Sequence, residues 1–98
     1  MSLRILLADD FDPWRRFVCS MVQKEPGAQI ICEVSDGLAA IHTAKLLKPD
    51  LILLDIGLPK LNGIAAAREI RKSAPESKIL FLTQESSADI VREVSVRH

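Results

Sequence analysis

Hydrophobic residues gather in four short runs along the chain, and each run has the length of a β-strand. The runs are LRILLA (3–8), QIICEV (29–34), LILL (51–54) and KILFLT (78–83). They are nearly continuous rather than alternating, which is typical of strands that are buried on both faces of a parallel sheet. The pattern therefore predicts a central sheet that is covered on both sides.

The segment after the first run has the periodicity of an amphipathic helix. Its hydrophobic side chains follow the spacing i, i+3, i+4, i+7 and i+8, and they are Trp14, Phe17, Val18, Met21 and Val22. Asp12 and Pro13 predict where this helix begins, because an aspartate side chain can cap free N–H groups and proline tolerates the first helical position. We therefore expect a helix that is capped by Asp12.

Three further segments between and after the runs also predict helices. The second helix is expected over residues 37–47 and ends before Pro49, and the third follows Asn62 and stops before Pro75. Their inward faces would carry Ala40, Ile41, Ala44, Leu47, Ala66, Ala67 and Ile70. The fourth opens at SSAD (86–89), which has capping-box spacing. Strands separated by single helices predict a doubly wound α/β domain with a parallel sheet.

A buried strand that runs straight into an acid raises the question of function. LILL is followed at once by Asp55, and the first run ends in Asp9 and Asp10. A carboxylate inside an apolar layer is costly unless it is neutralised, hydrogen-bonded or bound to a metal. Ligands in open α/β sheets bind outside the carboxyl ends of the strands. We therefore expect these acids to gather at that edge, together with Thr83 at the end of the fourth run.

Three carboxylates at one edge would repel one another strongly unless a cation offset them. Oxygen-only ligands suit Mg²⁺ or Mn²⁺ better than Zn²⁺. Any one of these acids alone would more often cap a helix or face water. Their joint placement favours a metal site, because Asp12 is already available as a cap and Asp55 is followed by IGLP rather than by a helix start.

Composition and charge narrow the function classes. The 98 residues include 48% hydrophobic ones and 13 basic against 13 acidic ones, which describes one globular domain without a strongly charged surface for nucleic acid or membrane. No segment approaches the length of a membrane span, so we expect a cytoplasmic protein. Cys19 and Cys32 lie apart in apolar surroundings, and we interpret both as reduced core residues.

Three motifs together resemble the receiver domain of two-component response regulators. They are LLADD (6–10) with its paired acids, LILLDIGLPKLNG (51–63) with an L-P-x-x-N-G turn after its aspartate, and ILFLT (79–83) with a terminal hydroxyl residue. The resemblance extends over nearly the whole chain. It implies a flavodoxin-like fold, whose full strand order is 2-1-3-4-5.

The resemblance also implies a role for each residue of the motifs. Asp55 would be the phosphoacceptor, which receives a phosphoryl group from a sensor histidine kinase or a phosphotransfer protein. Asp10 would bind Mg²⁺ directly, Asp9 would act mostly through water, and the backbone carbonyl of Gly57 would complete the protein ligands. Thr83 would be the switch hydroxyl that hydrogen-bonds the phosphoryl oxygens.

One feature of the family is missing. A full-length member continues into a fifth strand, which ends in a lysine that contacts the phosphate, and a fifth helix, whereas no lysine follows Lys78 in this chain. We therefore expect a truncated receiver domain over residues 1–98, with strand order 2-1-3-4 and without the fifth βα unit. Mg²⁺ binding should survive, while phosphorylation and switching should be impaired. The chain is either a fragment of a longer regulator or naturally short.

The fourth strand would become an edge of such a sheet. ILFLT would then present unpaired backbone groups and apolar side chains to solvent. We expect three ways of covering this edge: symmetric strand pairing in a homodimer, exchange of a segment, or rearrangement of residues 84–98.

The leading hypothesis is a phosphoacceptor receiver domain, which would contact DNA only through an output domain outside this chain. The alternative is an interaction and dimerisation module that works without phosphorylation. An enzyme acting on a separate substrate is not expected. The chain has neither GxxxxGK[ST] nor GxGxxG after a strand, and an aspartyl phosphatase would want a second aspartate where Gly57 stands.

Overall fold

A computed structural model describes residues 2–82 and 95–97 of the chain. The strands in this part are β1 (Leu3–Ala8), β2 (Ala28–Val34), β3 (Leu51–Asp55), β4 (Lys78–Leu82) and β5 (Ser95–Arg97). The helices are α1 (Asp12–Gln23), α2 (Gly37–Leu47) and α3 (Gly63–Ser73). The four predicted strands and the first three predicted helices are confirmed, and their ends differ from the expected ones by one residue or so.

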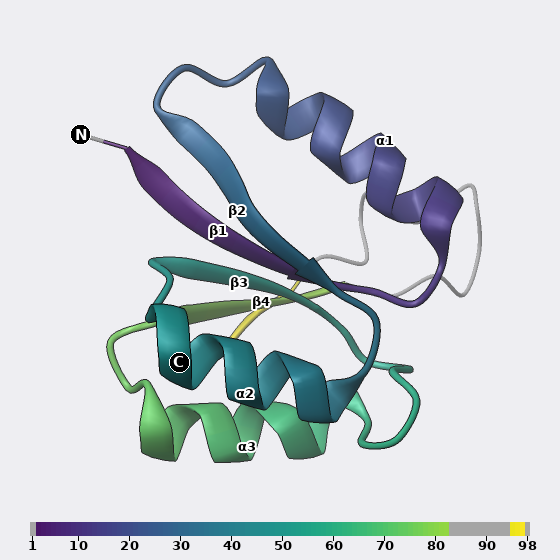
Figure 1. Ribbon diagram of the computed structural model, residues 1–98, viewed down its shortest axis with the longest axis vertical. Coiled ribbons are helices and arrows are strands. Elements are labelled where there is room, and N and C mark those ends of the chain that lie inside the picture. Colours follow the sequence, from purple (N-terminus) through teal and green to yellow (C-terminus); the bar gives the residue numbers. More distant parts are fainter. Residues whose placement is uncertain (1, 83–94, 98) are drawn as a thin grey trace.

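The strands form one sheet in the order β2-β1-β3-β4-β5. The pairs β1·β2, β1·β3 and β3·β4 are parallel. Helix α1 lies on one face of this sheet, and α2 and α3 lie side by side on the other (Figure 1). The predicted doubly wound architecture is therefore confirmed, and so is the order 2-1-3-4 of its parallel strands.

The core has two halves, one on each face of the sheet. Alternate residues of a strand point to opposite faces, so Leu6 belongs to the half under α2 and α3, and Leu7 belongs to the half under α1. The predicted inward residues Ala40, Ala44, Ala66, Ala67 and Ile70 are all buried. Double-sided burial explains why the strands are continuous apolar runs.

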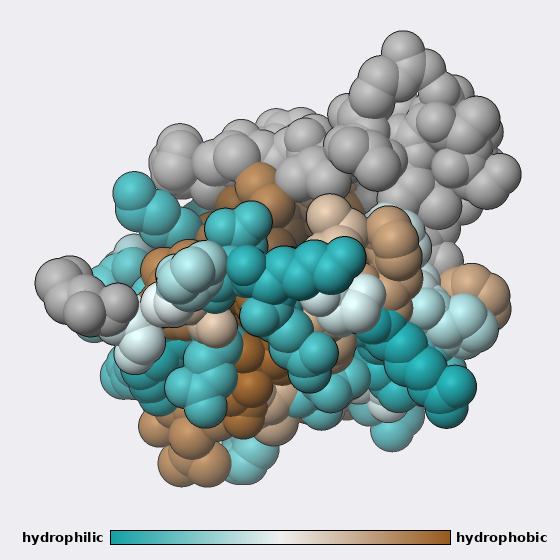
Figure 2. All heavy atoms as spheres, turned by 90° about the horizontal axis from the view of Figure 1, so that it is seen from above, coloured by the Kyte–Doolittle hydropathy of each residue, from teal (hydrophilic) through white to brown (hydrophobic). Residues whose placement is uncertain are grey.

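The side of the molecule that carries α1 is covered less completely. Val18 is buried, but Phe17 and Met21 are 46% and 48% exposed. Together with Leu80 they line part of an apolar groove between α1 and strands β3 and β4. Hydrophobic surface remains visible on this side (Figure 2). The predicted helix face is thus only partly a core face.

The edge of β4 is covered, as expected, and the strand that covers it comes from the chain itself. Strand β5 pairs antiparallel with β4, and Ile79, Leu80 and Phe81 lie opposite residues 97, 96 and 95. Backbone groups at an open edge favour any available partner, and the chain supplies one itself. Of the three expected ways of covering the edge, the pairing of residues 95–97 with β4 agrees with cover by the chain's own C-terminal part. The predicted fourth helix and Thr83 lie outside the described residues.

The predicted cap of the first helix is also wrong. Phe11 occupies the N-cap position without a side-chain cap, and Asp12 is the first helical residue. The Asp12 carboxylate instead forms an ion pair with Arg15, one turn along the helix. The other two helices do have side-chain caps, in which Asp36 accepts from the N–H of Ala39 at 2.8 Å and Asn62 from that of Ala65 at 2.9 Å.

Two further expectations concern the cysteines and the membrane. Cys19 and Cys32 are unpaired and partly exposed, and each packs against one half of the core. Within residues 2–82 and 95–97, no helix combines the length and apolar character that crossing a bilayer requires.

Candidate functional site

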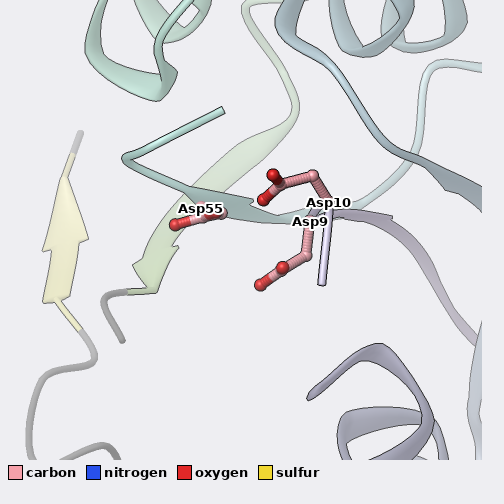
Figure 3. Close-up of side chains that lie close together, drawn as sticks. All are labelled: Asp9, Asp10 and Asp55. Atoms are coloured by element: carbon pink, nitrogen blue, oxygen red, sulfur yellow. The ribbon is translucent and has the colours of Figure 1, made fainter. Parts of the chain in front are cut away.

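Three carboxylates meet at the carboxyl edge of the parallel sheet. Asp55 is the last residue of β3, and Asp9 and Asp10 directly follow β1. The neighbouring strands are in register at Ala8 and Leu54, so the residues after them emerge together. One oxygen of each carboxylate lies within 4.8 Å of the others (Figure 3). The predicted convergence of Asp9, Asp10 and Asp55 is therefore confirmed.

Burial makes the charge on Asp55 costly. Asp9 and Asp55 are 0% and 6% exposed, whereas Asp10 is exposed to solvent. Removal from water raises the pKa of Asp55 above its ordinary value. The N–H of Gly57, which donates to Asp55 Oδ1 at 3.1 Å, partly offsets this rise, and the nearby Asp10 adds to it. Burial and Asp10 therefore disfavour the charged form of Asp55 more than the Gly57 N–H favours it.

Asp9 is held in place by the chain that follows it. Its Oδ1 accepts a hydrogen bond from the N–H of Phe11 at 2.9 Å. This short bond bends the chain between β1 and α1 and fixes the direction of the carboxylate. Asp9 thus shapes the turn before α1 as well as contributing to the acidic cluster.

The close packing of α3 against the end of β3 depends on Gly63. Its N–H donates to the carbonyl of Ile56 at 2.8 Å, which closes the loop after Asp55. A Cβ at this position would collide with the backbone carbonyl of Asp55. Only glycine lets the helix begin so near the backbone of Asp55.

The same loop is attached to the start of α2. The N–H of Gly37 donates to the carbonyl of Pro59 at 3.2 Å, and a Cβ on Gly37 would overlap the backbone of Leu61. Lys60, whose φ is +68°, places its Nζ 3.7 Å from Asp36 Oδ2. Two helix starts and one loop therefore form a packed frame around Asp55.

The donor set fits a hard divalent cation. Three carboxylates supply oxygen atoms only, and no histidine or cysteine belongs to the cluster. Among the side chains of residues 2–82, Asp10 and Asp55 form no salt bridge. Such a cluster would hold Mg²⁺ or Mn²⁺ better than Zn²⁺.

The sequence analysis named Gly63 only as the end of the L-P-x-x-N-G turn and did not name Arg15. The packing role of Gly63 could have been noticed, because helix propensity does not favour a glycine directly after the capping Asn62. Arg15, which contacts the main chain of Asp9, could have been found only as the i+3 partner of Asp12. Thr83 lies outside the described residues, and the role of the Gly57 carbonyl stays a prediction.

The chain is similar in sequence to a known protein family and to curated proteins. Residues 5–97 match the family described as response regulator receiver domain. The protein-glutamate methylesterase/protein-glutamine glutaminase of Alkalilimnicola ehrlichii is 37% identical over 81 residues, which are 83% of this chain and 21% of that protein. The corresponding protein of Colwellia psychrerythraea is 40% identical over 81 residues, with the same two shares. The chain thus spans about a fifth of the length of these curated relatives.

Solved structures of response regulators have a fold similar to that of this chain. The response regulator domain of Thermotoga maritima CheB has a TM-score of 0.81 at 28% identity, over 97% of this chain and 75% of that chain. A two-component response regulator of the LuxR family from Aurantimonas has a TM-score of 0.81 at 27% identity, over 95% of this chain and 66% of that chain.

The contact at Gly63 yields a prediction for stability. Gly63→Ala should lower the free energy of unfolding by about 1–3 kcal/mol, since the new Cβ must push α3 away from Asp55. Gly57→Ala is the matched control, because its Cβ would have only ordinary contact with the Asp55 side chain, at 3.9 Å. Urea unfolding measures both. Equal effects of the two substitutions would contradict the packing argument.

The raised pKa of Asp55 yields a prediction for pH and metal. The folded state keeps a proton on this carboxyl at pH values where the unfolded chain has lost it. The contribution of this carboxyl to the free energy of unfolding is therefore fully present below the ordinary pKa of an aspartate. It is lost as pH rises through the raised pKa of the folded state. At neutral pH without metal, Asp55→Asn should raise the melting temperature by a few degrees. Thermal unfolding measures this, with the exposed Glu76→Gln as control.

Mg²⁺ should reverse the difference in melting temperature between the wild type and the Asp55→Asn protein. The wild type would gain stability from a cation that binds only the folded state, and the Asn variant would gain less. An Asp55→Asn protein that is less stable than wild type without metal would contradict the view that the carboxylates repel one another.

Proposed function

This chain belongs to the response regulator receiver domain family, and on that premise we propose that Asp55 accepts a phosphoryl group from a sensor histidine kinase or a phosphotransfer protein. The observation that carries the proposal is the cluster of Asp9, Asp10 and Asp55 at the end of β1 and β3. In the transfer, a carboxylate oxygen of Asp55 forms a bond to phosphorus. The bond from phosphorus to the donor's imidazole nitrogen breaks, and that nitrogen keeps the electron pair.

The chain's own residues orient the acceptor. The N–H of Gly57 holds Asp55 Oδ1, which leaves Oδ2 as the candidate nucleophile. The frame of Gly63 and Gly37 keeps the following loop in place, so little motion is needed before reaction. Burial of Asp55 removes part of the water that would compete for its oxygens. These are the positioning effects on which phosphoryl transfer mainly depends.

Asp9 and Asp10 would hold Mg²⁺ or Mn²⁺ together with Asp55, and the carbonyl of Gly57 would complete the protein ligands. The chemistry that such a cation supplies when bound is charge neutralisation on the carboxylates and the incoming phosphoryl oxygens. The repulsion within the cluster supports this assignment. Thr83 would act as the switch hydroxyl by its place in the sequence, directly after β4.

The domain would pass its phosphorylation state to a partner or to an output domain. The relatives' names include an esterase and a LuxR-family regulator, so their outputs differ. We therefore propose a signalling role, in the cytoplasm where a kinase's phosphohistidine would be available. Contact with DNA and regulation of transcription would require residues outside this chain.

The alternative function, an interaction module that works without phosphorylation, has less support. Its main argument was an open β4 edge that could pair with a second copy. Strand β5 already pairs with Ile79, Leu80 and Phe81 along that edge. The acidic cluster, with Asp55 buried at its centre, would also have no use in such a module.

A small phosphodonor tests the proposed function. The chain incubated with acetyl phosphate and Mg²⁺ should gain the mass of one phosphoryl group, and Asp55→Asn or removal of the metal with EDTA should abolish the gain. Asp50→Asn is the matched control, because Asp50 precedes β3 at the opposite end of the same strand. Intact-mass spectrometry at neutral pH measures the adduct. A wild type without the adduct, or an Asp55→Asn protein that still carries it, would refute the assignment.

A further inference from the structure

We propose that Arg15 is a positioning residue for the metal ligands, because it holds the peptide group that joins Asp9 to Asp10. This inference rests on the proposed function, in which both aspartates face a bound cation. Arg15 lies on α1 and is not itself a member of the acidic cluster. It would act through the main chain rather than by touching the cation or the phosphoryl group.

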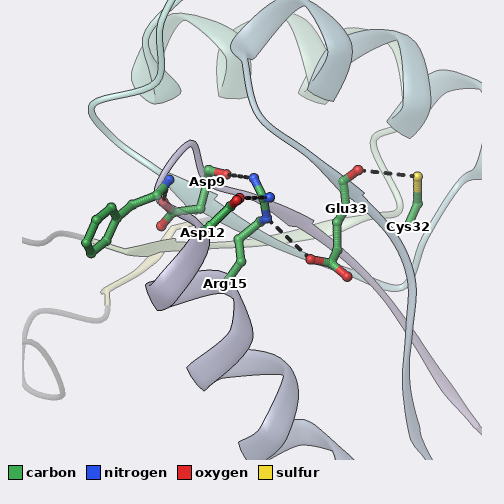
Figure 4. Close-up of polar contacts among 6 residues, drawn as sticks. Asp9, Asp12, Arg15, Cys32 and Glu33 are labelled. Carbon is green, nitrogen blue, oxygen red and sulfur yellow. Dashed lines mark hydrogen bonds and ion pairs between the residues drawn. The ribbon is translucent and has the colours of Figure 1, made fainter.

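The guanidinium of Arg15 contacts three separate parts of the fold (Figure 4). Its Nη1 donates to the backbone carbonyl of Asp9 at 2.7 Å. Its Nη2 pairs with the carboxylate of Asp12 on the first turn of α1. Its Nε lies 3.3 Å from Glu33 Oε1 on β2. Arg15 therefore connects the end of β1 to a helix on one side and to a neighbouring strand on the other.

The contact with the Asp9 carbonyl has a direct consequence for both acids. This oxygen belongs to the peptide unit between Asp9 and Asp10, and a peptide unit is planar. Holding the oxygen therefore fixes the orientation of the whole plane, and with it the direction in which the chain enters Asp10. The N–H of Phe11 already holds the Asp9 carboxylate at 2.9 Å. The two bonds together leave the pair of acids little freedom to turn away from Asp55.

Geometry rather than charge explains why an arginine suits this position. Asp12 and Glu33 both face the guanidinium, so its positive charge is balanced locally and little remains to attract the acidic cluster. A guanidinium has donors in a rigid planar fork, and here its two Nη groups donate to Asp9 and Asp12 while Nε lies within ion-pair distance of Glu33. A lysine ammonium on a flexible stem cannot reproduce this geometry. The side chain is only 19% exposed, so these contacts are not those of a freely solvated surface ion pair.

The experiment compares Arg15→Gln and Arg15→Lys with Arg16→Gln in the full chain. Arg16 is exposed on the same helix, so its substitution removes the same charge without touching Asp9. Mg²⁺ alone is titrated, and binding is followed by the fluorescence of Trp14, the single tryptophan of the chain. Urea unfolding of each variant defines conditions under which all of them are folded.

The expected result is a selective loss of metal affinity. Arg15→Gln and Arg15→Lys should weaken Mg²⁺ binding by about tenfold, as is typical when a group that orients metal ligands is removed. Arg16→Gln should stay within about twofold of wild type, since a single exposed charge is screened. The failure of lysine to restore the affinity would identify the fork, and not the charge, as the property that matters.

Two results would overturn the proposal. One is an Arg15→Gln protein that binds Mg²⁺ like Arg16→Gln, and the other is full rescue by Arg15→Lys. A wild type with no saturable response to Mg²⁺ would overturn the metal site and this role of Arg15 together. If Mg²⁺ affinity depends on Arg15 but the phosphodonor leaves Asp55 unmodified, only the proposed function fails.

Discussion

Repulsion among three carboxylates at one edge of the sheet is the constraint on which the site depends. Asp9 and Asp55 are almost fully buried, and their oxygens lie within 4.8 Å of one another and of Asp10. Such an arrangement is unfavourable by itself, because water cannot screen the buried charges well. It persists because the surrounding fold is stable enough to hold it. A cation would relieve the repulsion, and this would couple metal binding to the proposed chemistry of Asp55.

Packing of the core and of the turns beside it keeps the acids together. Two apolar half-cores, one on each face, fix the parallel register that ends β1 and β3 at the same edge. Gly63 lets α3 begin close to the Asp55 backbone, and Gly37 lets the loop after Asp55 pack on α2. Arg15 connects the other acidic segment to α1 and β2. Backbone N–H groups also hold one carboxylate oxygen each of Asp9 and Asp55, so main chain and side chain together orient these acids.

Sequence reasoning could predict the convergence of the acids because parallel strands share one carboxyl edge. Continuous runs located the four strands, and Asp55 directly after LILL located the site. It could not predict that Asp12 would pair with Arg15 instead of capping α1, since both contacts are available to an aspartate at a helix start. Nor could it predict β5, because a segment as short as SVR (95–97) has no periodicity and pairs only when β4 is beside it.

Carbon-13 NMR of the aspartate carboxyl groups, followed against pH with and without Mg²⁺, tests the central claim most directly. Without metal, the carboxyl of Asp55 should titrate above the ordinary range of an aspartate, because burial and Asp10 both raise its pKa. Saturating Mg²⁺ should lower that pKa, and the signals of Asp9, Asp10 and Asp55 should move with one shared dissociation constant. An ordinary titration of Asp55 that Mg²⁺ leaves unchanged would contradict the account.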